Sequence, residues 1–363
     1  MFTSIKYTPK FINPGSFASR TGKIFKKASC INKPINKTYS TPGYFGKSRN
    51  VREYSVSKAS SNTNSISNTS SNTSSNTSSK AKFPLNENYY SGKSVLITGG
   101  GTGLGKSMAD QFYNLGANVI ICSRNESVLN ATAKELTTAS NSNKIISKQL
   151  DVRNSDKVQE LNDWLYDNAL FPDIIINNAA ANFLAKSETL TPNAWNTIID
   201  IVLRGTINMT SIFGKKMIET GREGTFINIS TTYADTGSAF VVPSGVAKAG
   251  CNNLIRSLAS EWGSYRIRFV GVAPGPIYTD GAFSRIDPDG RLTEDLVKRL
   301  PLGRLPTKTE FANFISYLAS DYAKPINGEI INYDGGETAL NRGEFNSLLS
   351  LSNAEWDSFH SKL

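Results

Sequence analysis

Short apolar runs alternate with amphipathic stretches between residues 93 and 340. An apolar run that breaks into glycine or small polar residues predicts a buried strand. Such runs occupy 93–100, 118–124, 144–152, 173–180, 225–230, 267–275 and 328–336. Helices are expected between them, at 103–117, 126–140 and 155–169, after Pro243 and from Thr309. Strands that alternate with helices predict a parallel sheet that is covered on both faces.

The pattern indicates one folded domain, a Rossmann-like, doubly wound α/β sheet that binds its ligand at the carboxyl ends of the strands. Residues 60–79 contain only Ser, Asn and Thr apart from Ile66. Such a tract buries too little apolar area to offset its ordering entropy, which indicates a linker. The chain is therefore expected to divide into a leader (1–54), a low-complexity linker (55–90), the α/β domain (91–340) and a tail (341–363).

Positive charge is concentrated in the leader. The chain has a net charge of +10, but residues 1–52 hold eleven Lys and Arg and no acid, so removing these eleven leaves −1 for the rest. A nearly neutral domain gives no electrostatic support for nucleic-acid binding, and no nucleic-acid partner is predicted. A basic, Ser-containing leader whose first 52 residues lack acids is typical of a mitochondrial transit peptide, here with cleavage after Tyr54. A basic tail without fixed structure is the alternative.

The last three residues favour a second destination. The chain ends in Ser361, Lys362 and Leu363, a tripeptide that serves as a peroxisomal address. The leader favours the mitochondrial matrix, and the terminus leaves peroxisomal or dual localisation open. No apolar run is long enough to span a bilayer.

Histidine and cysteine usage narrows the chemistry. The single histidine, His360, stands close to the end of the chain, which argues against a Ser-His-Asp hydrolase and against a histidine-based metal centre. The cysteines, Cys30, Cys122 and Cys251, lack paired spacing, so neither a disulfide framework nor a metal site is predicted. Acid–base chemistry is therefore expected from Tyr, Lys, Asp or Glu, or from a bound cofactor.

The first predicted strand runs into a glycine-rich loop that opens a helix. Glycine permits positive φ and lets the backbone approach a pyrophosphate, whose charge is favoured at a helix N-terminus. The loop consists of Thr98, Gly99, Gly100, Gly101, Thr102, Gly103, Leu104 and Gly105. A dinucleotide site is predicted here, and a purely structural glycine turn is the alternative.

The second predicted strand ends in Ser123 and Arg124. A site that prefers NAD would place Asp or Glu here for the ribose 2′-hydroxyl, whereas a hydroxyl and an Arg suit a 2′-phosphate. We therefore predict NADPH as the cofactor. A solvated surface charge is the alternative interpretation of Arg124.

Four motifs in this order resemble the short-chain dehydrogenase/reductase family, and the resemblance covers essentially the whole chain after residue 93. They are the glycine-rich loop, Asn177-Asn178-Ala179-Ala180, Lys248 and Pro274-Gly275-Pro276-Ile277. The resemblance implies a homo-tetrameric reductase in which Asp151 lies near the adenine and Lys248 binds the nicotinamide ribose. It also implies that the cofactor is lined by Asn177, Pro274, Gly275, Pro276 and Ile277.

The chain departs from this family at the proton donor. The family's Ser, Tyr and Lys positions carry Thr231, Ser244 and Lys248 here, and its Asn position falls on Val202. One interpretation is a cofactor-binding member without catalytic activity. The other is that Tyr233, just after the fifth predicted strand, places its hydroxyl in the space that Ser244 leaves.

Five segments resemble the mitochondrial-type 2,4-dienoyl-CoA reductases, a subgroup in which the Tyr is displaced in this way and Ser occupies the usual Tyr position. The segments are 177–183, 192–203, 231–244, 281–288 and 343–348. The resemblance implies NADPH-dependent reduction of 2,4-dienoyl-CoA to 3-enoyl-CoA in the β-oxidation of polyunsaturated fatty acids. A reductase of 3-oxoacyl thioesters is the alternative, although such an enzyme is expected to keep Tyr at position 244.

The same resemblance implies roles around the substrate. Tyr233 and Asn182 would donate hydrogen bonds to the thioester oxygen, with Lys248 and Ser244 in the same catalytic site. A fatty acyl-CoA would contact Arg153, Phe183, Thr191 and Arg285. Residues 278–300, which are rich in Gly, Asp and Arg between a strand and a helix, suit a substrate lid, and a solvated loop is the alternative. The chain departs from the subgroup at Ala181 and Arg204, where Gly and an uncharged residue are expected.

Overall fold

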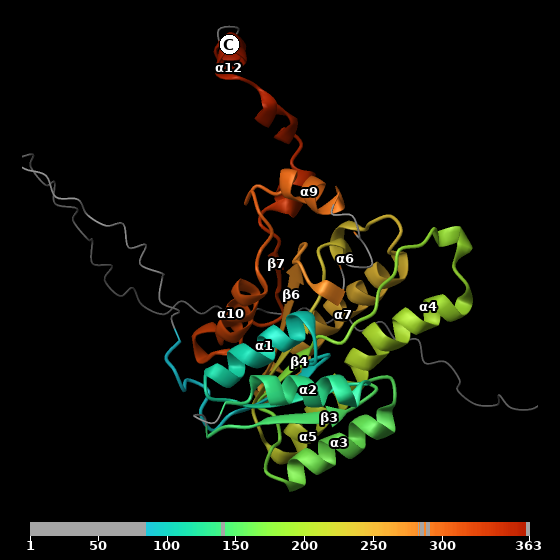
Figure 1. Cartoon of the computed structure of the whole chain (residues 1–363), viewed down its shortest axis with the longest axis vertical. Coiled ribbons are helices and arrows are strands. Elements are labelled where there is room, and N and C mark those ends of the chain that lie inside the picture. Colours follow the sequence, from blue (N-terminus) through green and yellow to red (C-terminus); the bar gives the residue numbers. More distant parts are fainter. Residues whose placement is uncertain (1–84, 139–141, 282, 284–286, 288–290, 361–363) are drawn as a thin grey trace, which may run out of the picture. The chain divides into compact units, whose positions relative to one another are not determined.

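A computed structural model describes residues 85–138, 142–281, 283, 287 and 291–360 of the chain (Figure 1). Seven strands form one parallel sheet in the order β3-β2-β1-β4-β5-β6-β7. The strands are β1 (Ser94–Thr98), β2 (Asn118–Ser123), β3 (Ile145–Gln149), β4 (Ile174–Asn177), β5 (Gly224–Ile229), β6 (Ile267–Pro274) and β7 (Ile330–Tyr333). The predicted doubly wound α/β sheet is confirmed, and each strand overlaps one of the apolar runs.

The strand order reverses direction at β1. Strands β2 and β3 lie on one side of β1, and the chain then crosses over so that β4 lies on the other side. Val95 of β1 is accordingly paired with both Val119 of β2 and Ile174 of β4. Such a reversal opens a crevice at the carboxyl ends of the strands, because the following loops leave in opposite directions.

Helices cover both faces of the sheet (Figure 1). On one face pack α1 (Gly103–Asn114), α2 (Glu126–Leu136) and α10 (Lys308–Ala319); on the other pack α3 (Ser155–Asp167), α5 (Gly205–Thr220) and α7 (Val242–Glu261). Alternate residues of β1 pack on opposite faces of the sheet: Val95 and Ile97 lie in the core beneath α1, and Leu96 lies in the core beneath α5. This period of two is what a strand buried on both faces requires.

A π-helical turn, Asp200–Arg204, joins α4 (Pro192–Ile199) to α5. Its geometry brings the start of α5 against the loop after β3. A Cβ at Gly205 would lie 2.4 Å from Cγ2 of Val152, so only glycine lets the helix approach so closely. Val202 is fully buried within this turn.

Residues 85–90 belong to the domain, although the sequence pattern assigned them to the linker. Leu85 and Tyr90 are buried in the core of the α1 face. The Tyr90 hydroxyl donates a hydrogen bond of 2.5 Å to the Ser316 carbonyl oxygen, and its ring lies 5.1 Å from that of Phe112. The burial of Leu85 and Tyr90, in an otherwise polar stretch, therefore extends the folded domain to residue 85.

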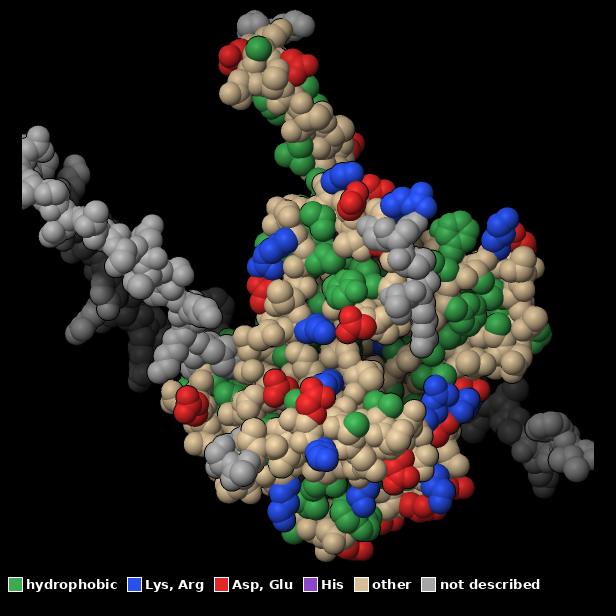
Figure 2. All heavy atoms as spheres, in the orientation of Figure 1, with side chains coloured by type: hydrophobic (Ala, Val, Ile, Leu, Met, Phe, Trp, Pro, Cys, Tyr) green, Lys and Arg blue, Asp and Glu red, His purple; other side chains and the backbone are tan. Residues whose placement is uncertain are grey.

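Shorter helices complete the described chain: α6 (Tyr233–Thr236), α9 (Arg291–Lys298), α11 (Glu337–Arg342) and α12 (Asn353–His360). No helix in the described ranges has the length and apolarity needed to cross a bilayer. Basic and acidic side chains are interspersed on the face shown in Figure 2. The leader, Arg285 and the terminal tripeptide lie outside the described residues.

Candidate active site

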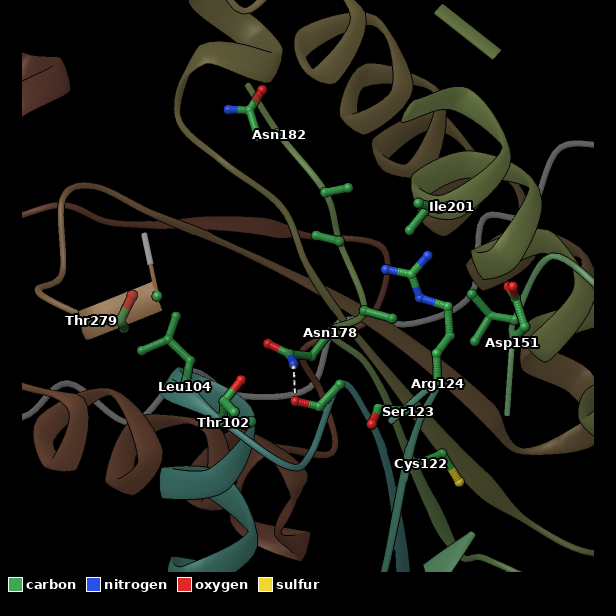
Figure 3. A pocket seen from close by; sticks show the side chains of 18 of the residues that line it. Thr102, Leu104, Cys122, Ser123, Arg124, Asp151, Asn178, Asn182, Ile201 and Thr279 are labelled. Carbon is green, nitrogen blue, oxygen red and sulfur yellow. Dashed lines mark hydrogen bonds between the residues drawn. The ribbon is translucent and has the colours of Figure 1, made fainter. Parts of the chain in front are cut away.

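A cavity of about 970 Å³ opens at the carboxyl ends of β1, β2 and β4 (Figure 3). It lies at the edge of the sheet that the topology predicts, and the loops after β3 and β6 complete its wall. Of the predicted cofactor residues, those that line it are Gly99, Thr102, Gly103, Leu104, Gly105, Ser123, Arg124, Asp151, Gly275 and Ile277. Gly100, Gly101, Pro274 and Pro276 belong to the same loops but are not part of its lining.

The glycine-rich loop is shaped by two requirements. Gly99 and Gly103 have φ of +68° and +53°, which L side chains rarely adopt. Gly105 has a different reason, since a Cβ there would lie 2.2 Å from the Gly99 carbonyl oxygen. Thr98 fixes the loop to the end of β4, because its Oγ1 accepts hydrogen bonds from the backbone N–H groups of Asn178 (3.0 Å) and Ala179 (2.9 Å).

The N-terminus of α1 points free N–H groups at the cavity. The first N–H groups of an α-helix lack intrahelical partners. Thr102, the residue before α1, gives them no side-chain cap, and no acidic residue stands in the first turn. In contrast, Asn125 and Asn154 cap α2 and α3 with their side chains. An uncapped helix start beside a tight glycine loop fits the pyrophosphate of a dinucleotide.

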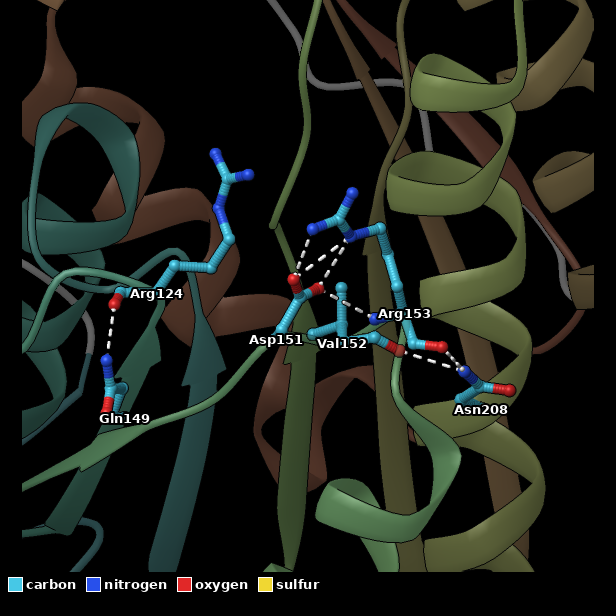
Figure 4. A network of polar contacts seen from close by, with 6 residues as sticks. All are labelled: Arg124, Gln149, Asp151, Val152, Arg153 and Asn208. Carbon is cyan, nitrogen blue, oxygen red and sulfur yellow. Dashed lines mark hydrogen bonds and ion pairs between the residues drawn. The ribbon is translucent and has the colours of Figure 1, made fainter. Parts of the chain in front are cut away.

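Ser123 and Arg124 line the cavity at the end of β2, and the Arg124 side chain extends into it (Figure 3). The backbone of Arg124 is held by Gln149, whose Nε2 donates to its carbonyl oxygen at 2.9 Å (Figure 4). The positive charge therefore sits where the second strand delivers the ribose of a bound dinucleotide.

Asp151 and Arg153, on the loop after β3, form an ion pair (Figure 4). Arg153 donates to the carboxylate from Nη2 at 2.5 Å and from Nε at 2.9 and 3.0 Å. The Arg153 side chain thereby holds the pKa of Asp151 below its usual value. Asp151 lines the cavity, and Arg153 does not. Because the two side chains form an ion pair, a change at one of these two predicted ligand contacts affects the other.

Tyr233, Asn182 and Ser244 come together from three parts of the chain. The Tyr233 hydroxyl accepts a hydrogen bond from Asn182 Nδ2 at 3.2 Å and lies 3.1 Å from Ser244 Oγ. Asn182 is oriented by Phe183, whose backbone N–H donates to its Oδ1 at 2.9 Å, which leaves Nδ2 facing the tyrosine. Ser244 is buried at the start of α7.

Lys248 lies one helical turn after Ser244 and is almost completely buried. Its ammonium donates a hydrogen bond to the carbonyl oxygen of Ile229, the last residue of β5. Burial lowers the pKa of Lys248. Among the described residues no hydrogen bond joins Lys248 to Tyr233.

Two predicted contacts are placed elsewhere. The side chain of Asn177 is buried away from the cavity and donates to Thr210 Oγ1 (3.2 Å) and Asn228 Oδ1 (2.9 Å). Its neighbour Asn178 lines the cavity instead. Thr191 caps α4, since its Oγ1 accepts from the Ala194 backbone N–H at 3.2 Å.

Two apolar lining residues, Leu184 and Ile201, were not assigned a role from the sequence, whereas Phe183 lines the cavity as expected. Thr279, at the start of the predicted lid 278–300, also lines the cavity; residues 282, 284–286 and 288–290 of that segment lie outside the described residues. Phe183 and Leu184 keep 37% and 54% of their surface exposed, and together they form an apolar part of the cavity wall. Two adjacent large apolar residues in the loop after the fourth strand are the signal that could have revealed this wall.

Comparisons with known proteins find similar sequences and a similar structure. The sequence model described as Enoyl-(Acyl carrier protein) reductase matches residues 99–338. An uncharacterized oxidoreductase of Caenorhabditis elegans is 44% identical over 257 residues, covering 70% of this chain and 82% of that protein. Another Caenorhabditis elegans protein, named probable 2,4-dienoyl-CoA reductase, (3E)-enoyl-CoA-producing, is 39% identical over 262 residues, covering 71% of this chain and 84% of its own.

A solved structure is also similar. The crystal structure of a short chain dehydrogenase from Bacillus anthracis superposes with a TM-score of 0.62 and 39% identity, over 68% of this chain and 97% of the other. The residues matched by the family model include Tyr233, Ser244 and Lys248 together with the lining of the cavity.

Proposed function

This chain belongs to the short-chain dehydrogenase/reductase family, and from that premise we propose that it reduces 2,4-dienoyl-CoA to 3-enoyl-CoA with NADPH. The observation that carries the proposal is the displaced tyrosine. Tyr233 reaches Ser244 and Asn182 with its hydroxyl at 3.1 and 3.2 Å, while Ser244 occupies the position of the family's usual tyrosine. The name of the Caenorhabditis elegans relative supports the substrate class.

The cavity suits a dinucleotide that carries a nicotinamide. The glycine-rich loop and the uncapped start of α1 would hold the pyrophosphate, and Lys248 would hold the ribose next to the nicotinamide. Ser123 and Arg124 would bind a 2′-phosphate, which is why we favour NADPH over NADH. When bound, the cofactor supplies a hydride to the far end of the conjugated diene.

Asn182 and Tyr233 are placed to stabilise the negative charge that the reduction creates. Reduction of a dienoyl thioester at its far end places negative charge on the thioester oxygen. Asn182 Nδ2 carries two N–H donors, of which one is used on Tyr233 and the other is left for this oxygen. Tyr233 provides the second donor. A preorganised donor aimed at a developing oxyanion contributes about 3 kcal/mol.

Tyr233 is also the proposed proton donor. An ordinary tyrosine, with a pKa near 10, is a weak acid at neutral pH. The hydrogen bond from Asn182 holds the phenol oxygen in place during proton transfer. With Ser244 as the donor to the same oxygen, the single O–H of Tyr233 stays free to point at the substrate, and the oxygen is kept in place while the proton leaves. The proton goes to the carbon next to the thioester, which leaves the double bond at position 3.

The decisive experiment follows NADPH oxidation with a 2,4-dienoyl-CoA and, separately, a 3-oxoacyl-CoA. Tyr233→Phe removes one hydroxyl at nearly constant volume, and Tyr265→Phe, at an exposed tyrosine on the loop before β6, is the matched control. We expect turnover of the dienoyl substrate, a fall of about 100-fold or more in kcat for Tyr233→Phe, and no change for Tyr265→Phe. Activity confined to the 3-oxoacyl substrate, or unaffected by Tyr233→Phe, would contradict the proposal.

A further inference from the structure

Four charged residues of alternating sign form a cluster beside the cavity: Asp151, Arg153, Asp200 and Arg204. Arg153 is paired with Asp151, and Arg204 Nε donates to Asp200 Oδ1 at 2.8 Å. The pKa of Arg153 is raised by its hydrogen bond to Asp151 and by the charges of Asp151 and Asp200. The two ion pairs therefore act on each other, and we call them the charge cluster.

Packing of the π-helical turn brings the two pairs together. Gly205 lies against Val152, where a Cβ would come within 2.4 Å of the valine side chain. Asn208, one turn further along α5, donates from Nδ2 to the carbonyl oxygens of Val152 (2.9 Å) and Arg153 (3.2 Å) (Figure 4). These contacts fix the start of α5, and with it Arg204, beside the loop that carries Arg153.

The charge cluster borders the cavity. Asp151 and Val152 line the cavity from one side, and Ile201, the residue after Asp200, lines it from the other. Figure 4 shows Arg124 and Arg153 on opposite sides of Asp151. Arg124 thus faces the proposed cofactor ribose, whereas Arg153 lies on the other side of Asp151, next to Asn208 of α5 (Figure 4).

Arg204 is not needed to hold the fold. Its side chain is 62% exposed, and the hydrogen bond to Asp200 stays within one helical turn. An exposed pair of this kind contributes about 0.5 kcal/mol. A guanidinium has five N–H donors, and among the described contacts only Nε of Arg204 is engaged. A phosphate offers more charge and more acceptor oxygens than one carboxylate, so it competes well for such a guanidinium.

We propose that Arg204, together with Arg153, binds a phosphate group of the coenzyme A portion of the thioester substrate. The inference rests on the proposed function and deepens it, because it assigns a specificity-determining residue for the carrier rather than for the acyl group. In the absence of substrate, Asp151 and Asp200 hold the two guanidinium groups in ion pairs. When the substrate binds, its phosphate replaces the carboxylates as the partner of the guanidinium groups.

The test compares Arg204→Gln with Lys215→Gln. Lys215 stands on the same helix, three turns further along, in a similar exposed pair with Glu219. Each variant is assayed with the dienoyl-CoA and with the same dienoyl group on pantetheine, which lacks the nucleotide and its phosphates. For Arg204→Gln we expect KM for the CoA thioester to rise about fivefold to tenfold, with kcat and KM for NADPH unchanged and no effect on the pantetheine thioester. Lys215→Gln should leave all constants unchanged.

Two further variants separate binding from helix structure. Arg204→Lys keeps the charge but loses the planar fork, so it should recover part of the affinity. Asp200→Asn removes the carboxylate that competes for Arg204, so KM for the CoA thioester should fall. If the Arg204–Asp200 pair only stabilised the helix, the same variant would have a lower melting temperature and an unchanged KM. The 3′-dephospho-CoA thioester identifies the phosphate, because the Arg204→Gln effect disappears with it only if the 3′-phosphate is the ligand.

Calorimetric titration of free CoA into the full-length protein gives a readout that is independent of turnover. Equal CoA affinities for wild type and Arg204→Gln would overturn the inference even if dienoyl-CoA is reduced. A weaker CoA affinity in Arg204→Gln, in an enzyme that reduces only the 3-oxoacyl thioester, would support the inference while the proposed function fails. A rise in KM for NADPH instead of for the thioester would assign Arg204 to the cofactor and overturn the inference.

Discussion

The Tyr233 hydroxyl oxygen lies 3.1 Å from the Ser244 hydroxyl oxygen, although the two residues stand on different helices, α6 and α7. The loop between them turns at Gly237, with φ of +72°, and at Phe240, with φ of +66°. Phe240 is pinned by the Ala185 backbone N–H, which donates to its carbonyl oxygen at 3.0 Å. A tyrosine from one helix thereby fills the space beside a serine at the start of the next.

Removal of the Ser244 hydroxyl is expected to slow the reaction without unfolding the protein. Ser244→Ala deletes one of the two partners of the Tyr233 hydroxyl but leaves Asn182 in place. We expect kcat to fall about tenfold, which corresponds to one hydrogen bond, and the melting temperature to change little. Steady-state kinetics and thermal denaturation measure both. Ser238→Ala, in the exposed loop between the two helices, is the control; equal kcat values for the two variants would show that Ser244 has no part in the reaction.

Arg124 is expected to decide the choice between NADPH and NADH. Replacement by Glu places a carboxylate where the ribose 2′ position is expected, which repels a phosphate and accepts a hydroxyl. For Arg124→Glu we expect kcat/KM with NADPH to fall about 100-fold, while the value with NADH stays the same or rises. Lys157→Gln, in an exposed pair on α3, controls for the loss of positive charge. Parallel losses with both cofactors would mean that Arg124 does not contact the phosphate.

Gly105 is expected to be essential for the shape of the cofactor loop. In Gly105→Ala the new Cβ would lie 2.2 Å from the Gly99 carbonyl oxygen and 2.8 Å from Asn178 Nδ2. The backbone must shift, so we expect the free energy of unfolding to fall by about 2 kcal/mol and NADPH binding to be lost. Chemical denaturation and fluorescence titration with NADPH test this. Gly263→Ala is the matched control, because its Cβ would meet only Asn327 Nδ2, at 3.7 Å.

Lys248 is expected to affect the pH dependence of stability as well as catalysis. Burial depresses its pKa in the folded state below the ordinary value of 10.5, so the unfolded chain binds more protons between the two values. In that window wild-type stability gains from rising pH, and Lys248→Met lacks this gain. Unfolding measured as the pH rises toward 10.5 should therefore shift in favour of wild type, while kcat/KM of the variant is about 100-fold lower throughout. Parallel stability curves would contradict a buried, titrating lysine.

The fold could be predicted from sequence because its signals are local. Seven apolar runs and their intervening amphipathic stretches reproduce the sheet, since burial on both faces makes central strands such as β1 and β2 almost continuously apolar. The start of the domain could not be predicted as well from the sequence. Leu85 and Tyr90 follow a polar tract, and only their packing against Phe112 and α10 shows that they belong to the core.

The site was predictable in residue type but not in side-chain direction. The motif Asn177-Asn178 marks the end of β4, yet it does not say which amide faces the cavity. Successive residues at a strand end point to opposite sides, so a single-residue difference moves the side chain from the cavity to the buried contacts with Thr210 and Asn228. The pairing of Arg153 with Asp151 was likewise invisible, because both residues were assigned separately to ligands.

The sequence by itself determined the parallel sheet, the glycine-rich loop that opens α1 and the set of residues from which acid–base chemistry can come. These follow from periodicity, from the conformational freedom of glycine and from the near absence of histidine, all of which are properties of short segments. Only the tertiary structure decided which side chains meet. Asn182 and Tyr233 are 51 positions apart, and the turn that ends at Arg204 packs against the loop after β3 because Gly205 lets the start of α5 approach Val152. Such meetings depend on how loops close and helices pack, which no local pattern encodes.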